Sequence, residues 1–239
     1  MNEDILTYLA GFLDGEGSID LNHSRYSVRI RVCQTVEEPL QRYVNIFGGK
    51  VYCQTRLTTG GKPYFYYDTN DSKRCGIILS QLYPLLIVKQ AKAQVALERL
   101  GLPVPAFDYP EYLSDSYFAG FFDAEGSVSM RFREGNKITP QIRVSQNMEL
   151  PLLLFQDRFG GSIYKKKIHS SNVQQPYEWM MIQSSIEEFC DAMIPYCLVK
   201  REHLMLLKKF SSIRLLNNGK DSRIGEKQSL ALKIVGLNN

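Results

Sequence analysis

A short segment that occurs twice constrains this sequence more than any other feature. The chain carries LAGFLDGEG at residues 9–17 and FAGFFDAEG at residues 118–126, nearly half of its 239 residues later. In each copy the apolar side chains recur three and four residues apart, as on one face of a helix. Small residues at similar spacing would let two helix backbones approach closely. The repeat therefore predicts two motif helices packed together at the centre of a duplicated fold.

The last acid of each copy stands where an acid is unfavourable. Glu16 and Glu125 fall at the C-terminal ends of the predicted helices, where the helix dipole is negative. If the helices pack side by side, the two carboxylates meet and repel each other unless a cation joins them. Mg²⁺ suits such a place because it binds one or two carboxylates together with waters and a phosphate. Ordinary surface acids are the alternative, and the recurrence of the pattern argues against it.

Composition sets only wide limits on the class of protein. The chain is 44% hydrophobic and 23% charged, as expected of a soluble globular protein. Its net charge of +4 is weak evidence for a polyanionic partner. No apolar run is long enough to cross a bilayer, so no membrane partner is expected. The five cysteines form no C-x-x-C pair, which argues against zinc and predicts reduced thiols in a reducing compartment.

The order of predicted elements repeats with the motif. Each half gives a helix, two strands, a helix, two strands and a helix, which is an α+β pattern with antiparallel hairpins. We expect an N-terminal half over residues 1–100, a proline-rich linker over residues 101–113 and a C-terminal half over residues 114–239. The two halves would form a saddle of antiparallel sheets around the central motif helices. Residues 206–239 have no counterpart in the first half and are either a solvated extension or a basic phosphate contact.

The predicted strands alternate apolar residues with arginine, tyrosine and short polar residues. Arg29 and Arg31 fall on one face of their strand, whereas Val28 and Ile30 fall on the other. The apolar face would pack on helices, and the polar face could lie in a DNA major groove. A solvated strand face is the ordinary alternative. The predicted contacts with bases and phosphates are Ser27, Arg29, Arg31, Tyr52, Gln54, Arg56, Tyr64, Tyr66, Ser129, Arg131, Arg133, Arg143, Tyr164 and Lys166.

The two motifs resemble those of a single-chain LAGLIDADG homing endonuclease of the kind encoded in group I introns, and the resemblance extends over most of both halves. It implies that Glu16 and Glu125 bind divalent metal beside the scissile phosphates, with backbone carbonyls near Gly15 and Ala124. The implied cofactor is Mg²⁺, with Mn²⁺ able to substitute. A bound metal ion lowers the pKa of the attacking water and stabilises the leaving oxygen.

Some relatives also place a glutamine and a lysine around the metal in each half. The resemblance assigns these roles to Gln34, Gln146, Lys89 and Lys200. Glutamine can orient the attacking water, and lysine can neutralise charge that develops on the phosphate. The alternation places Gln34 on the apolar face, so a bulge or the strand end must redirect its side chain. The remaining motif residues, Gly11, Asp14, Gly120 and Asp123, are expected to be structural.

Three functions compete on these grounds. The leading hypothesis is a monomeric endonuclease that cuts one phosphodiester on each strand of double-stranded DNA and leaves 3′ overhangs. Its target would be about 20 base pairs, because each half could span about one duplex turn. The second is an RNA maturase that assists group I intron splicing, so intron RNA is a further candidate partner. The third is a DNA-binding regulator with a vestigial site. The cellular location would be an organelle or a bacterial or archaeal cytoplasm.

Overall fold

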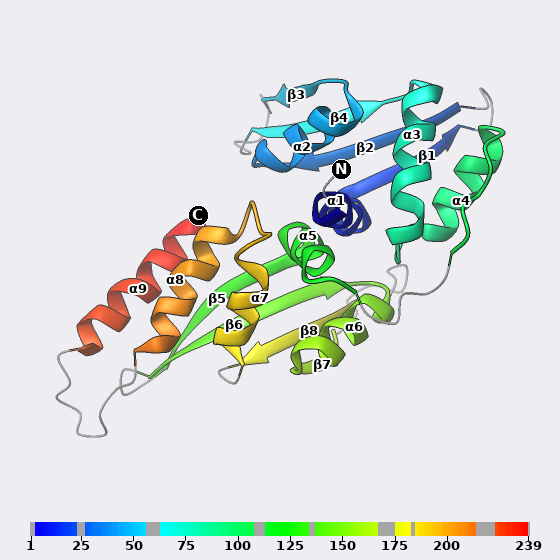
Figure 1. Cartoon of the computed structure of the whole chain (residues 1–239). Helices are drawn as coiled ribbons and strands as arrows, with labels where there is room; N and C mark the ends of the chain where they lie inside the picture. Colours follow the sequence, from blue (N-terminus) through cyan, green and yellow to red (C-terminus); the bar gives the residue numbers. More distant parts are fainter. Residues whose placement is uncertain are drawn as a thin grey trace. The chain divides into compact units, whose positions relative to one another are not determined.

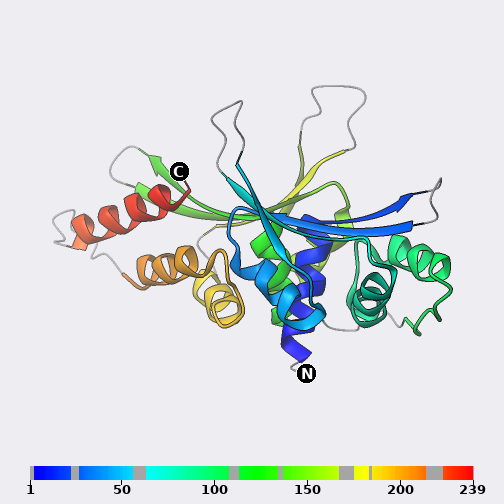
Figure 2. The same cartoon turned by 90° about the horizontal axis from the view of Figure 1, so that it is seen from above.

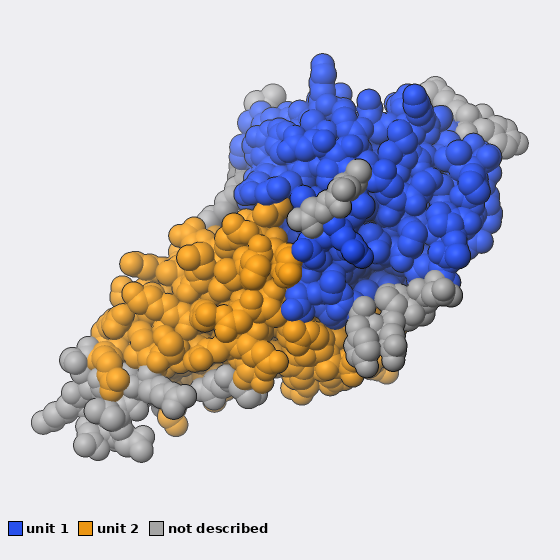
Figure 3. All heavy atoms as spheres, in the orientation of Figure 1, with its two compact units in different colours: residues 1–124 blue, residues 125–239 orange. Residues whose placement is uncertain are grey.

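The computed structural model of the chain describes residues 3–22, 27–55, 63–107, 113–133, 137–166, 175–182, 185–213 and 223–238. Two compact units divide the chain, residues 1–124 and residues 125–239, and Figure 3 colours them separately. The first unit contains α1 (Glu3–Glu16), β1 (Gly17–Asn22), β2 (Ser27–Gln34), α2 (Glu38–Phe47), β3 (Val51–Gln54), β4 (Tyr64–Thr69), α3 (Ser72–Leu82), the 3-10 helix η1 (Tyr83–Leu85), α4 (Gln90–Arg99) and α5 (Asp115–Glu125) up to Ala124. The second contains β5 (Gly126–Arg133), β6 (Lys137–Gln146), α6 (Glu149–Phe159), β7 (Ser162–Lys165), β8 (Tyr177–Ile182), α7 (Ile186–Met193), α8 (Arg201–Ser212) and α9 (Arg223–Leu237).

The described strands form one four-stranded antiparallel sheet in each unit. The first sheet, called sheet A here, has the order β1-β2-β4-β3, and the second, called sheet B, has the order β5-β6-β8-β7. The two orders are equivalent, strand for strand. Figure 1 shows the helices that accompany each sheet. The predicted α+β class and the duplicated order of elements are therefore confirmed.

The alternation predicted for the strands is present in β2. Val28, Ile30 and Val32 are fully buried, whereas Arg29 is exposed and Arg31 is half-buried. The buried face packs against α1, α2, α3 and α4, which lie on the same side of sheet A in Figure 2. The other face of sheet A is left uncovered by these helices. Sequence alternation alone thus decides which side chains this open face presents.

An aromatic side chain with a polar tip joins each sheet to the helix that precedes its third strand. The hydroxyl of Tyr67 donates a hydrogen bond to the carbonyl oxygen of Gly48 at 3.1 Å. The indole Nε1–H of Trp179 donates to the carbonyl oxygen of Gly160 at 2.7 Å. Both glycines end a helix in the left-handed region, with φ of 72° and 73°. The large buried ring fills the core while its polar tip satisfies a carbonyl that the helix leaves open.

The C-terminal residues form packed helices in the described part of the tail. The last helix, α9, packs against α8 and β5 and buries Leu230, Ala231 and Ile234. The side-chain amide of Asn238 donates to the carbonyl oxygen of Val128 on β5 at 3.0 Å. Val128 lies on the edge strand of sheet B, so this end of the chain covers part of that edge. Among the described residues, every helix falls short of the length and apolar character that a membrane crossing requires.

Candidate nucleic-acid interface and metal site

The motif helices α1 and α5 touch through their backbones. A methyl group built on Gly11 would lie 2.2 Å from the carbonyl oxygen of Tyr117, and one built on Gly120 would lie 2.0 Å from that of Tyr8. No side chain larger than hydrogen fits at such distances. The two contacts are equivalent, because each glycine faces the residue three positions before the other. The structure thus places both motif glycines at the close helix contact.

The first acid of the first motif is buried and fully engaged. Asp14 accepts hydrogen bonds from the backbone amides of Ile87 at 2.6 Å, Val88 at 3.1 Å and Lys89 at 2.8 Å. The hydroxyl of Tyr117 also donates to Asp14, at 2.7 Å. Burial raises the pKa of the Asp14 carboxyl, and these donors act in the opposite direction. The carboxylate therefore fixes the chain segment before α4 against the end of α1.

The corresponding acid of the second motif has the equivalent tyrosine contact. Asp123 is fully buried, and the hydroxyl of Tyr8 donates a hydrogen bond to its carboxylate at 2.8 Å. Each motif helix thus sends one tyrosine to the aspartate of the other helix. Two buried hydrogen bonds to carboxylates flank the glycine contact and hold the rotation of one helix about the other.

Lys89 lies at the C-terminal end of α1. Its ammonium donates to the carbonyl oxygen of Asp14, and to that of Gly15 at 3.2 Å. The last turn of α1 contains no basic residue of its own, so Lys89 supplies the positive charge that a helix C-terminus favours. Lys89 and Lys200 each precede a helix, α4 and α8, with nearly identical φ and ψ of −103° with 10° and −103° with 9°. The two lysines therefore hold equivalent backbone positions in the two units.

The two candidate metal ligands also hold equivalent positions. Glu16 is the last residue of α1 and Gly17 begins β1; Glu125 is the last residue of α5 and Gly126 begins β5. The side chain of Glu16 is exposed and that of Glu125 is half-buried. The meeting of the two carboxylates stays a prediction.

The donor set at the end of α1 fits a hard cation. The carbonyl oxygens of Asp14 and Gly15 already accept a positively charged group, the Lys89 ammonium, next to the Glu16 carboxylate. Oxygen donors of this kind suit Mg²⁺. Within the described residues no group of three or more His, Cys, Asp or Glu side chains could hold a metal by itself. A cation here would therefore need waters or a bound phosphate to complete its coordination.

The two candidate glutamines end their strands in the same way. The side-chain oxygen of Gln34 accepts from the backbone amide of Thr35 at 2.7 Å and from its hydroxyl at 3.0 Å. The side-chain oxygen of Gln146 accepts from the backbone amide of Asn147 at 2.7 Å. Gln34 is the last residue of β2 and Gln146 is the last residue of β6, and both side chains are half-buried. Each glutamine thus ends its strand with its side chain bonded to the residue that follows.

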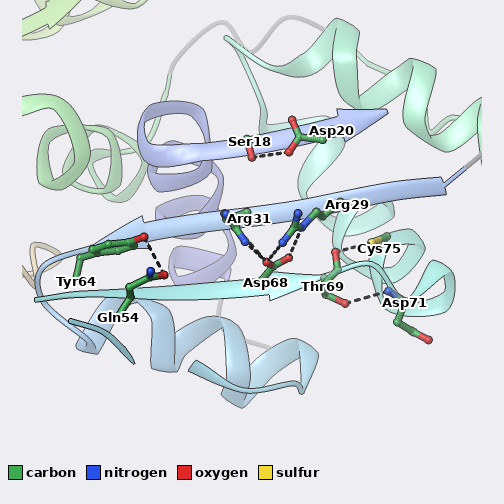
Figure 4. A network of polar contacts seen from close by, with 10 residues as sticks. All are labelled: Ser18, Asp20, Arg29, Arg31, Gln54, Tyr64, Asp68, Thr69, Asp71 and Cys75. Atoms are coloured by element: carbon green, nitrogen blue, oxygen red, sulfur yellow. Dashed lines mark hydrogen bonds and ion pairs between the residues drawn. The ribbon is translucent and has the colours of Figure 1, made fainter. Parts of the chain in front are cut away.

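Arginines and an aspartate form a network on the open face of sheet A (Figure 4). The Nε of Arg29 donates to Asp68 at 2.7 Å, and its Nη2 donates to the same carboxylate. Arg31 donates through Nε at 3.0 Å and through Nη2 at 2.6 Å. The hydrogen bonds from Arg29 and the ion pair with Arg31 hold the pKa of Asp68 below its usual value. Two of the predicted DNA-contacting arginines, Arg29 and Arg31, are therefore oriented by an acid that the sequence analysis left out of the site.

Tyrosines extend the same face beside the arginines. The ring of Tyr66 lies under the Arg31 guanidinium, 5.1 Å from its centre, and stacks with Tyr52 at a centroid distance of 5.2 Å. The hydroxyl of Tyr64 donates to the side-chain oxygen of Gln54 at 3.2 Å. A hollow of about 600 Å³ opens on this face. Its lining comprises Asp20, Leu21, Ser27, Arg29, Arg31, Tyr52, Tyr66, Asp68 and Asn70.

The matching face of sheet B is built differently. Lys166, just past the end of β7, donates to Glu178 and to Ser145 at 2.8 Å each. Arg143 donates to the side chain of Gln141, and its Nε is buried without an acceptor among the described residues. The other predicted contacts on this face, Ser129, Arg131, Arg133 and Tyr164, lie on β5 and β7, with Ser129 half-buried and the other three exposed.

One predicted contact lies outside the described residues, and two acids join the predicted contacts on the open faces. Arg56 lies outside the described residues, so its role stays a prediction. Asp68 and Glu178 are acids on the predicted DNA face that sequence reasoning missed as site residues. The alternation of β4 does place Asp68 on the outward side. The signal that could have found it is an outward acid among outward basic and aromatic residues.

No model of a known protein family matches the chain. A probable intron-encoded endonuclease aI2 of Debaryomyces hansenii is 25% identical over 91% of the chain, and the intron-encoded RNA maturase bI4 of Saccharomyces cerevisiae is 26% identical over 67%. The chain spans only 35% and 25% of the lengths of these two relatives. The solved structure of the LAGLIDADG homing endonuclease I-GzeII in complex with its DNA target superposes with a TM-score of 0.71 at 17% identity. That match covers 95% of this chain and 96% of the other.

These matches and the geometry agree on the architecture. The protein is a duplicated α+β protein in which two glycine-bearing helices accompany two four-stranded antiparallel sheets. It has the fold of the LAGLIDADG homing endonucleases, as the resemblance of the two motifs predicted.

Proposed function

We propose that the chain is a site-specific endonuclease that cuts double-stranded DNA with the help of a divalent cation. One observation supports this most directly. In both motifs an acid is the last residue of the helix, and the glycine after it begins the sheet. An acid is thus delivered twice to the start of a sheet whose strands present arginines on one face. Two such placements would supply one acid for each strand that is cut.

Under this proposal, one group of residues binds DNA and another binds the metal. Arg29, Arg31 and Tyr66 of sheet A, with Arg131 and Arg133 of sheet B, would contact bases and phosphates in the major groove. The longest strands, β2 of 8 residues and β6 of 10 residues, would follow the groove for roughly 26 and 33 Å, most of one turn in each half, so the complete target is about 20 base pairs. We propose that one phosphodiester on each strand is hydrolysed to leave 3′ overhangs, and that the protein acts as a monomer.

Glu16 and Glu125 would hold the metal together with the carbonyl oxygens near Gly15 and Ala124. Mg²⁺ is the proposed cofactor, with Mn²⁺ as a substitute, and it would activate the attacking water and stabilise the leaving oxygen. Because the described residues provide few side-chain ligands, DNA phosphate should strengthen metal binding. Lys89 would then neutralise charge that develops on the phosphate near the end of α1.

The test replaces both glutamates. The double variant Glu16→Gln, Glu125→Gln should lose cleavage of a selected target in Mg²⁺ while binding to that target in EDTA is kept. Glu98→Gln is a matched control, because Glu98 is an exposed acid in the last turn of another helix, α4. Cleavage by the double variant at the wild-type rate would show that the site is assigned wrongly.

A second candidate function is intron RNA maturation, which the similarity to the yeast maturase favours. A maturase needs an RNA-binding surface and not the two acids. Splicing of a host group I intron in the presence of the double variant would separate the activities. Wild-type protein that supports neither splicing nor cleavage would leave binding alone as the function.

A further inference from the structure

One carboxylate on the open face of sheet A receives four hydrogen bonds from two arginines. Asp68 takes the Nε and Nη2 donors of Arg29 and the same two donors of Arg31. Its side chain is 13% exposed, whereas those of the arginines are 46% and 40% exposed. The acid therefore lies inside, and the guanidinium groups lie between it and solvent.

Strand pairing explains why this cluster forms. Arg31 is the direct partner of Asp68 across the β2–β4 pair, and Arg29 is two residues away on the same face. A guanidinium has five N–H donors, and Asp68 uses two from each arginine. Each arginine thus keeps donors for a second partner while its plane is fixed by the first.

An acid on a DNA-binding face would be costly if the face served only to attract phosphates. Asp68 repels phosphate and cancels one of the two positive charges beside it, which lowers non-specific affinity. The hollow of about 600 Å³ on this face is lined by the same three side chains and by Tyr52 and Tyr66. The cluster therefore suits an uncharged hydrogen-bond acceptor, such as the edge of a base, better than a phosphate.

Sheet B shows that the fold does not require this acid. Val32 pairs with Tyr67 in sheet A and Val144 pairs with Trp179 in sheet B, which fixes the equivalent positions. The strand partner of Arg31 is Asp68, but the strand partner of Arg143 is Met180. The Nε of Arg143 is buried and has no acceptor in the described part of the chain, whereas the Nε of Arg31 is bonded to Asp68.

We propose that Asp68 is a positioning residue that gives the DNA half-site under sheet A its base selectivity. It holds Arg29 and Arg31 in fixed planes, so that their remaining donors meet guanine O6 and N7 and not mobile phosphate oxygens. This inference rests on the proposed DNA-binding function. It also implies that the half-site under sheet B lacks an equivalent guanine preference at the position that faces Arg143.

The experiment compares Asp68→Asn with Asp20→Asn. Asp20 lines the same hollow, carries the same charge and faces Arg29 across the β1–β2 pair. It accepts a hydrogen bond from Ser18 at 3.2 Å (Figure 4) and acts on Arg29 only through its charge. Each protein selects from a random-sequence duplex library in EDTA, and affinities for selected and unrelated duplexes are measured at several salt concentrations. Wild type should enrich guanines at fixed positions in one half-site.

Asp68→Asn should lower the preference for guanine over other bases at those positions by about tenfold, while affinity for unrelated duplex rises. Asp20→Asn should keep the guanine preference although it removes the same charge. Met180→Asp offers a gain-of-function test that does not depend on the folding of Asp68→Asn. It should add a guanine preference in the other half-site, because it supplies an acceptor beside Arg143.

Each outcome decides between explanations. If Asp68→Asn keeps the wild-type preferences, or if Asp20→Asn loses them equally, the positioning role is wrong. If Met180→Asp folds and adds no preference, the carboxylate alone does not confer selectivity and the inference fails. If wild type enriches no sequence at all, the proposed function fails, and this inference fails with it.

Discussion

Sheets A and B share one plan on their buried faces and differ on their open faces. On the buried side, Val32 with Tyr67 corresponds to Val144 with Trp179, and each aromatic residue bonds to a helix-ending glycine carbonyl. On the open side, an acid that orients two arginines corresponds to Met180. The fold therefore constrains the residues on the buried face of each sheet. The residues on the open face are free to differ according to what that face binds. Under the proposed function, the two half-sites of the DNA target should differ in sequence.

The largest loss of stability should come from changes at the contact between α1 and α5, to which each motif contributes one glycine. Gly11→Ala and Gly120→Ala each place a methyl group within 2.2 Å of a backbone carbonyl oxygen. Each should lower the free energy of unfolding by about 3 kcal/mol or more, because backbone cannot move aside as a side chain can. Chemical denaturation would measure the loss. Two variants as stable as wild type would show that the motif helices do not cross at these glycines.

The aromatic anchors provide the next test, because they should respond unequally. Trp179→Phe removes ring volume and the bond to Gly160, and it should cost about 3 kcal/mol. Tyr67→Phe removes only the hydroxyl that bonds to Gly48, and it should cost about 1 kcal/mol. Denaturant unfolding of the two variants, measured side by side, checks the difference. Equal losses would mean that the two positions are not equivalent in packing.

A smaller effect should mark the open face of sheet A. Asp68→Asn should lower the free energy of unfolding at pH 7 by at most about 1 kcal/mol, because the arginine side chains are 46% and 40% exposed and solvent screens the ion pairs. The ion pairs lower the pKa of Asp68, so their stabilisation is complete above its ordinary value of 3.8 and is lost as the pH falls below it. Unfolding curves of variant and wild type should therefore converge in acid. A difference that grows as the pH falls would contradict the assignment.

The smallest effect should come from α9, and it should have the opposite sign. A methyl group on Gly225 would meet nothing within 4 Å, and α9 has no counterpart in the first unit. Gly225→Ala should therefore raise stability by up to about 1 kcal/mol, since alanine favours the helix. Thermal unfolding of this variant beside Gly11→Ala separates helix propensity from steric exclusion. A destabilised Gly225→Ala would indicate a contact that the fold does not show.

The fold was predictable from sequence because its rules are local. Alternation in β2 predicted which of Arg31 and Val32 faces the helices, and the spacing of small residues predicted the close contact at Gly11. The duplicated motif predicted that the second half repeats the first. None of these inferences required knowledge of which strands pair.

The contacts within the site depend on strand order and register, which the sequence does not specify. The alternation of β4 directs Asp68 outward, but only the pairing of β2 with β4 brings it beside Arg31. Likewise, Lys89 was predicted from the resemblance, but its contact with the Gly15 carbonyl depends on how Asp14 fixes the preceding segment. Long-range partners of this kind are chosen by tertiary packing, so single-sequence reasoning names the residues and misses their neighbours.

The contact between α1 and α5 has a consequence for how such chains change over time. Its closest approaches join main-chain atoms of the two helices. They require glycine at positions 11 and 120, and they depend little on which side chains stand at the other positions. Neighbouring positions can then accumulate substitutions without loosening the helix pair, provided that the glycines and the core volume persist. This tolerance offers a physical reason why the same architecture is kept in a protein that shares only 17% of its residues with this chain.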